Sequence, residues 1–287
     1  MALKISAWLR LARVEHAFIA AFAVVSAQAL VTHRFDASFL YPALAPFLVT
    51  VASFVANDYF DFASDKALKR KDRPLVSGEI SRKNAFYAAA ALYVLALAAA
   101  APLPKTAFLI ILVYAGLSIA YNAFLKRLPL VGNAFIASSM AISFLYGNLV
   151  ISPALNYYVL LFCVVSFSAG LGREFLITLR DVAGDKKIGA RTLPMLLGAK
   201  RTVILANALI YFAVVLSLLP LAEKTFFLPY AVLVLAADAL FIAVVLKTSL
   251  AQGMGGRERT ETLRFARNAS LLALLVGTLA FASLALA

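Results

Sequence analysis

Apolar residues run along this chain in nine long stretches, separated by polar segments. The stretches cover approximately residues 14–32, 39–57, 84–102, 105–121, 131–151, 156–177, 201–220, 226–246 and 266–286. A helix needs about 20 apolar residues to cross the hydrocarbon core of a membrane, and the stretches have about this length. The pattern predicts an all-α, polytopic membrane protein with nine transmembrane helices in a single bundle, which forms one domain over residues 1–287.

The composition agrees with this pattern. Hydrophobic residues make up 63% of the 287 residues and charged residues 14%, whereas soluble domains carry about 25% charged residues. Residues 1–13, which include Trp8, are too polar for the apolar core of a cleaved signal peptide. They are predicted to form an amphipathic helix that lies at the membrane interface.

The basic residues predict the orientation of the chain. Of the 27 Lys and Arg residues, only Arg34, Lys105 and Lys224 fall on one side of the predicted bundle. Because Lys and Arg accumulate in cytoplasmic loops, the N-terminus and the long loops are predicted in the cytoplasm and the C-terminus outside the cell membrane. The net charge of +13 then mainly reflects topology, although a basic face also suits anionic membrane lipids or a phosphorylated substrate. It gives no indication of a nucleic-acid partner.

The two longest polar segments, residues 58–83 and 178–200, resemble each other and are predicted to be motif and cap loops on the cytoplasmic side. A shift of 120 residues superimposes Asp61 on Asp181, Asp65 on Asp185, Lys66 on Lys186, Lys71 on Arg191, Pro74 on Pro194 and Gly78 on Gly198. This match predicts a pseudo-repeat in which the second and sixth helices are equivalent, with the two acidic clusters facing each other. The alternative is that two cytoplasmic loops are independently charged and rich in Pro and Gly.

Acidic and amide side chains share one helix face in each segment, if the helix continues through it. In the first segment these are Asn57, Asp58, Asp61 and Asp65, and in the second Glu174, Thr178, Asp181 and Asp185. Stacked carboxylates near a bilayer repel each other and need a cation. Mg²⁺ prefers oxygen ligands and is often held by one or two carboxylates together with substrate phosphates. The clusters therefore predict a magnesium site that binds a phosphate or diphosphate.

Basic and aromatic residues near these clusters fit a diphosphate with an apolar tail. Arg13 and Lys126 lie against span ends, and other cations follow the two acidic clusters; the alternative is that these cations only mark topology. Tyr121 and Tyr146 are candidates to stabilise a developing cation through their ring faces. Aromatic residues in membrane helices also commonly face lipid or the interface.

Four segments, NDYFDFASDK, RPLVSGEIS, YNAFLKRLPLVGN and REFLITLRDVAGDKKIGARTLP, resemble the signature segments of the UbiA-type intramembrane prenyltransferase superfamily. The resemblance covers all nine spans. It implies that two Mg²⁺ ions bind an isoprenyl diphosphate and promote loss of diphosphate, after which a lipid or aromatic acceptor captures the allylic carbocation. It also implies that the loops after Asp65 and Asp185 exclude water from the site.

The resemblance assigns roles to individual residues. The metal-binding positions correspond to Asn57, Asp58, Asp61, Asp65, Asp181 and Asp185. The positions expected to bind the diphosphate or the substrate correspond to Arg13, Lys66, Arg73, Lys126, Asn133, Glu174, Thr178 and Lys186.

The second acidic segment is most similar to the archaeal ether-lipid branch, which adds a second geranylgeranyl chain to geranylgeranylglyceryl phosphate. It departs from that branch where Leu179-Arg180-Asp181 replaces an acidic pair. A polyprenyl transfer to 4-hydroxybenzoate or another aromatic acceptor in quinone synthesis stays an alternative. The sequence leaves the prenyl chain length, any general base and the oligomeric state open.

The residues do not favour two other classes of membrane protein. An ion-coupled transporter would use ionisable residues within its spans, but apart from Asp238 the middles of the spans are nearly free of charge. Asp238 is interpreted as a hydrogen-bonded helix-packing residue. A phosphatidyl-type phosphotransferase would carry a DGxxAR motif, which the chain lacks.

Overall fold

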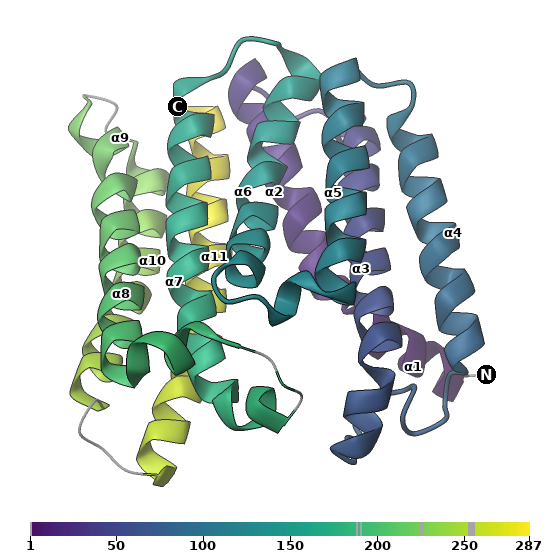
Figure 1. The fold of residues 1–287 in the computed structure, drawn as a ribbon. Coiled ribbons are helices and arrows are strands. Elements are labelled where there is room, and N and C mark those ends of the chain that lie inside the picture. The colour runs from purple at the N-terminus through teal and green to yellow at the C-terminus, as the bar shows by residue number, and fades with distance from the viewer. Residues whose placement is uncertain (1, 188, 190, 224–226, 252–255) are drawn as a thin grey trace. The chain divides into compact units, whose positions relative to one another are not determined.

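The computed structural model describes residues 2–187, 189, 191–223, 227–251 and 256–287, and within them all regular secondary structure is helical (Figure 1). The side chains of residues 2–4, 183–187 and 257 lie outside this description. The helices are α1 Ala2–Ala12, α2 Val14–Thr32, α3 Leu40–Ala67, α4 Arg82–Ala100, α5 Lys105–Ala123, α6 Val131–Ile151, α7 Tyr157–Lys187, α8 Leu193–Ser217, α9 Leu219–Ala222, α10 Leu228–Leu250 and α11 Gly256–Ser283, with short 3₁₀ turns at Ala37–Phe39 (η1), Leu125–Arg127 (η2) and Leu284–Leu286 (η4).

Within the described residues, nine helical segments are long and apolar enough to cross a membrane. Each of them overlaps one of the nine predicted stretches. The prediction of an all-α chain with nine spans is therefore confirmed, and α1 occupies the segment predicted as a separate amphipathic helix.

The second and sixth spans extend further than the apolar pattern predicts. Helix α3 has 28 residues and ends at Ala67, and α7 has 31 residues and ends at Lys187. Neither NDYFDFASDK nor residues 178–183 contain Gly or Pro, so nothing in the local sequence stops the helix when the apolar run ends. Both acidic motifs thus begin on helices, and the loop after the first motif is shorter than the predicted loop at 58–83.

The chain divides into two compact units. The first comprises Met1–Val25 and Asp36–Leu125, and the second comprises Ser26–Phe35 and Lys126–Ala287. The two long helices α3 and α7 belong to different units, and their equivalence by a pseudo-repeat stays a prediction.

In the first unit, α3 packs against α1, α4 and α5. The face of α4 that is buried is made mostly of alanine, at Ala85, Ala89, Ala96 and Ala100. Small side chains let helices approach closely, which supplies the packing that membrane helices depend on. The hydroxyl groups of Tyr93 on α4 and Ser118 on α5 lie 2.7 Å apart and form a hydrogen bond.

In the second unit, α7 packs against α6, α8 and α11, while α10 packs against α8 and α11 (Figure 1). Helix α7 packs tightly against α8 at Gly172, where a Cβ atom would lie 2.6 Å from the carbonyl oxygen of Ala206. A ring cluster of Phe144, Phe162 and Phe281 packs within the same unit. The unit thus has its own dense core.

Asp238 on α10 is buried in this unit. The Ser217 hydroxyl lies 2.9 and 3.1 Å from its two carboxyl oxygens. The contact joins α8 to α10 and agrees with the interpretation of Asp238 as a hydrogen-bonded packing residue.

Candidate active site

The first acidic motif occupies the C-terminal end of α3. Asp58 and Asp65 are buried, with 2% and 6% of their surface exposed, and Asp61 is partly exposed. Because the helix continues through the motif, Asn57, Asp61 and Asp65 recur at every fourth residue along one face. This face presents one amide and two carboxylate groups.

Asp58 is bound by two arginine side chains from outside α3. Its Oδ1 accepts hydrogen bonds from Arg73 Nη1 at 2.6 Å and from Arg13 Nη2 at 3.1 Å. Arg73 comes from the loop after α3, and Arg13 comes from the break between α1 and α2. A buried carboxylate that accepts charge-assisted hydrogen bonds from two guanidinium groups holds both in place.

Arg73 also reaches the end of the motif. Its Nε lies 3.6 Å from Asp65 Oδ2, and Arg70 Nη1 lies 3.5 Å from Asp65 Oδ1. These two ion pairs are longer than the hydrogen bonds that Arg13 and Arg73 form with Asp58. Two arginines of the loop therefore cover the acidic face of the helix end.

Arg13 adopts an unusual backbone conformation at this site. Its φ of 45° is in the left-handed region, which costs energy for a residue other than glycine. Its guanidinium carbon lies 4.9 Å from the centre of the Phe54 ring, and this cation–π contact offsets part of the backbone cost. The hydrogen bond to Asp58 offsets more of it. Burial lowers the pKa of the Arg13 guanidinium, Arg73 lowers it further and Asp58 opposes both. Arginine nevertheless stays protonated at neutral pH, so Arg13, Arg70 and Arg73 give the site three fixed positive charges.

A hydrogen-bond chain from α5 determines how the Asn57 amide is oriented. Asn122 Nδ2 donates to the carbonyl oxygen of Ser53 at 3.1 Å, and Asn57 Nδ2 donates to Asn122 Oδ1 at 3.0 Å. A backbone carbonyl only accepts hydrogen bonds, so Asn122 must present its oxygen to Asn57. The Asn57 oxygen is then the atom that remains for a cation.

These donors fit Mg²⁺ chemically. The Asn57, Asp61 and Asp65 face offers carboxylate and amide oxygens, the hard donors that this ion prefers. Among the described side chains, no three acidic, histidine or cysteine residues form a metal-binding group. The α3 face by itself therefore supplies part of a coordination shell.

The other predicted residues of the first unit lie near this helix end. Lys66 is exposed, and its Nζ lies 5.9 Å from the centre of the Phe62 ring. Tyr121 is partly exposed on α5, next to the buried Asn122.

The second acidic motif is held by contacts along α7. Arg180 donates two hydrogen bonds to Asp181, at 2.7 and 2.8 Å. Arg173 pairs with Glu174 at 2.9 Å. Asn133 on α6 donates to the Thr178 hydroxyl at 2.8 Å, and this hydroxyl donates to the Glu174 carbonyl.

The remaining predicted residues of the second unit have different surroundings. The side chains of Asp185 and Lys186 lie outside the described residues. Lys126 is partly exposed in η2. Tyr146 has 1% of its surface exposed. Its neighbour Asn148 bonds the backbone of the α6–α7 connection at Ser152, Ala154 and Asn156, so Asn148 stabilises that turn.

The sequence analysis did not identify Asn122 and Arg180 as site residues. Asn122 lies in the YNAFLKRLPLVGN segment, where a buried polar residue at the end of an apolar helix is a usable signal. Arg180 is adjacent to Asp181 in sequence, but neighbouring helix residues seldom face each other, and only the structure shows that they pair.

A profile of the UbiA prenyltransferase family matches residues 17–254 of the chain. The chain belongs to this family. The UbiA match together with the nine spans makes the protein an intramembrane prenyltransferase.

The chain is also similar to curated members of the UbiA family. Digeranylgeranylglyceryl phosphate synthase of Archaeoglobus fulgidus is 34% identical over 278 residues, which is 94% of this chain and 92% of that protein. The enzyme of the same name from Korarchaeum cryptofilum is 32% identical over 217 residues, 76% of each chain.

Solved structures agree with the fold. A structure from work on the biosynthesis of digeranylgeranylglyceryl phosphate synthase in membranes has a TM-score of 0.76 at 26% identity and covers 99% of both chains. A UbiA homologue from Archaeoglobus fulgidus bound to DMAPP and Mg²⁺ has a TM-score of 0.65 at 20% identity, and the match covers 96% of this chain and 98% of that one. The second likeness bears on the fold alone.

Proposed function

We propose that this UbiA-family protein transfers a geranylgeranyl chain from geranylgeranyl diphosphate to geranylgeranylglyceryl phosphate. The observation that carries the proposal is the similarity to digeranylgeranylglyceryl phosphate synthase over 94% of the chain. The α3 site supports it, because partly buried arginines and hard oxygen donors at the end of an apolar helix suit a diphosphate with a hydrocarbon tail.

The proposed reaction replaces one carbon–oxygen bond by another. The bond between the allylic carbon and the diphosphate breaks, and its electron pair leaves with the diphosphate. The free glyceryl hydroxyl of the acceptor attacks the allylic cation and forms an ether bond. The hydroxyl proton is released to water or to a base.

In this proposal Arg13 and Arg73 bind the diphosphate, and Asp58 positions both arginines. Guanidinium groups match phosphate oxygens in geometry and charge. The hydrogen bonds of Asp58 to both arginines support a positioning role for it in place of the predicted metal ligation. Lys66, Lys126 and Lys186 add positive charge around the leaving group.

Mg²⁺ is the proposed cofactor, in two ions, and a relative of the same fold was solved with DMAPP and Mg²⁺. Asn57, Asp61 and Asp65 would hold one ion, and Asp181 and Asp185 the other. When bound, the ions stabilise charge on the departing diphosphate as Lewis acids.

The other predicted residues are proposed to contact the substrate. Asn133 on α6 and Thr178 on α7 are joined by a hydrogen bond, and Thr178 donates to the backbone carbonyl of Glu174. The side chains of Asn133, Thr178 and Glu174 would face the polar part of a substrate. Tyr121 and Tyr146 would stabilise the cation through their ring faces. The loops that follow the two motifs would exclude water, which would otherwise capture the cation.

An acceptor panel tests the proposal. Purified protein receives geranylgeranyl diphosphate and Mg²⁺ with either geranylgeranylglyceryl phosphate or 4-hydroxybenzoate, and diphosphate release and lipid product are measured. We expect product with the glyceryl phosphate. Product with 4-hydroxybenzoate alone would contradict the proposed acceptor and would favour a role in quinone synthesis with the same chemistry.

Variants of the two motifs test the site. We expect Asp61→Ala and Asp181→Ala each to lower kcat at least about 100-fold, the order found when one electrostatic contact to a transition state is lost. Glu258→Ala is the control, because this carboxylate is exposed near the start of α11 and belongs to neither acidic motif. Full activity in both motif variants would contradict the metal assignment.

A further inference from the structure

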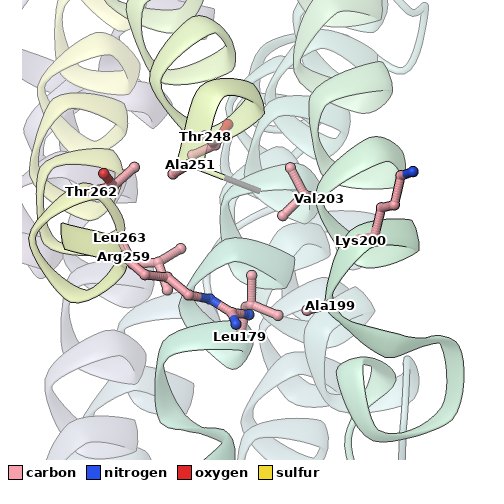
Figure 2. Close-up of a pocket in the computed structure, with 9 residues that line it drawn as sticks. All are labelled: Leu179, Ala199, Lys200, Val203, Thr248, Ala251, Arg259, Thr262 and Leu263. Carbon is pink, nitrogen blue, oxygen red and sulfur yellow. The ribbon is translucent and has the colours of Figure 1, made fainter. Parts of the chain in front are cut away.

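A small cavity lies between the ends of four helices in the second unit, as Figure 2 shows. Its volume is ≈ 40 Å³. Leu179 of α7, Val203 of α8 and Leu263 of α11 form an apolar wall, while Lys200, Arg259 and Thr262 supply polar groups. A volume of this size has room for a group of a few heavy atoms, such as a phosphate.

The cavity is separate from the second acidic motif. Leu179 is buried in the core that α7 forms with α8, α10 and α11. Asp181 follows two residues later, about 200° further around the helix, and Thr178 contacts α6. The motif and the cavity therefore occupy different faces of α7.

The positive charge at the cavity comes from two helices. Arg259 of α11 is partly exposed, and Figure 2 shows its guanidinium directed across the cavity toward Leu179 and Ala199. Lys200 of α8 is exposed, with its amine turned away from the centre. Within the described part of the chain, neither cation forms a hydrogen bond or ion pair. Both charges are thus available to an anion.

The surroundings of the cavity favour a lipid over a fully water-soluble anion. A wider hollow of ≈ 490 Å³ adjoins it, shares Leu179, Ala199, Arg259 and Leu263, and extends to Arg180, which pairs with Asp181. On α8, Leu196 and Ile204 expose 59% and 53% of their surface, as expected for side chains that face hydrocarbon. A molecule with a phosphate at the cavity can lay an apolar chain along this surface.

We propose that the cavity binds the phosphate-bearing headgroup of an anionic membrane lipid. Arg259 would contact the phosphate oxygens, and the Thr262 hydroxyl would donate to one of them. The exposed Lys200 side chain would turn toward the cavity to add the second positive charge. None of the residues that line the cavity belongs to the proposed prenyl-transfer site, so a lipid-binding experiment tests this proposal separately from the proposed function.

Thermal unfolding of the full chain in neutral detergent tests the proposal. The Tm is measured while phosphatidylglycerol, phosphatidylcholine or inorganic phosphate is added. A ligand that binds only the folded state raises the Tm. We expect phosphatidylglycerol to raise it and the other two to have little effect.

Charge-removing variants locate the site. Each cation near a phosphate surface contributes about 1 kcal/mol, so Arg259→Gln and Lys200→Gln should each raise the half-effective phosphatidylglycerol concentration about fivefold. Arg264→Gln and Arg201→Gln are the controls, because both are exposed on the same two helices and neither lines the cavity. Lys200 is exposed, so its variant should fold normally.

Three results would overturn the proposal. The first is an equal loss in the control variants, which would indicate general surface charge. The second is an equal shift with phosphatidylcholine, which would show that the headgroup charge is not recognised. The third is protection by free phosphate with none by lipid, which would make the cavity a site for a soluble anion.

Discussion

Asn122 fixes which atom of Asn57 faces the acidic end of α3. The two amides form a chain that ends on the Ser53 carbonyl oxygen, and only one orientation of each amide satisfies it. Mutation of residues that orient metal ligands in this way typically costs about 10–100-fold in metal affinity or activity. Asn122 is therefore a positioning residue in the proposed site.

Replacing Asn122 by Leu should weaken the metal site. We expect the half-saturating Mn²⁺ concentration, measured by electron paramagnetic resonance, to rise about tenfold, because the Asn57 amide loses the partner that orients it. Ser118→Ala is a control one turn earlier on α5, where the hydroxyl bonds Tyr93. An unchanged Mn²⁺ affinity would contradict the role of Asn122.

Asp58 is predicted to act through Arg13 and Arg73. We expect Asp58→Asn to lower the free energy of unfolding by about 3 kcal/mol, because two partly buried guanidinium groups lose their buried carboxylate partner. The KM for the prenyl diphosphate should rise about tenfold or more while Mn²⁺ binding is kept. Loss of Mn²⁺ binding with an unchanged KM would instead identify Asp58 as a metal ligand.

At the scale of elements, α7 and α8 can pack closely because Gly172 has no side chain. A Cβ at Gly172 would lie 2.6 Å from the Ala206 carbonyl oxygen and 2.8 Å from Ile210 Cγ1. Contacts this short require the two helices to move apart. The interface is part of the core that supports the second acidic motif.

Gly172→Ala should therefore lower the free energy of unfolding by about 1–3 kcal/mol, measured by reversible unfolding in detergent. Gly116→Ala on α5 is the matched control, because a Cβ there would have no atom within 4 Å. The control should be neutral or stabilising, since alanine favours a helix over glycine by up to about 1 kcal/mol. Equal effects in both variants would contradict the packing argument.

At the scale of the whole molecule, the basic residues predict one orientation in the membrane. Cys163 is the single cysteine of the chain, so a Cys163→Ser background allows reporter cysteines. We expect Lys105→Cys to react with a membrane-impermeant maleimide in intact cells and Lys71→Cys to react only after lysis. The reverse pattern would place the loop after α3 outside the cell.

Much of the fold could be predicted from the sequence, and less of the candidate site. The nine spans agree with the apolar stretches because each stretch has enough length and hydropathy by itself. The ends of the second and sixth spans were placed too early, since hydropathy falls where polar residues begin, whereas the helix continues until a local stop such as Lys69, with a φ of 54°. The acidic motifs were identified, but the partners of their side chains were not.

The sequence by itself thus determined the number of spans, the helical class and the acidic, amide and basic residues available for chemistry, because these depend on one segment at a time. Tertiary structure decided how those residues are engaged. Arg13 lies 45 positions from Asp58, and Asn122 lies 65 positions from Asn57. Contacts over such separations arise only when helices pack, and packing depends on the shape of both surfaces.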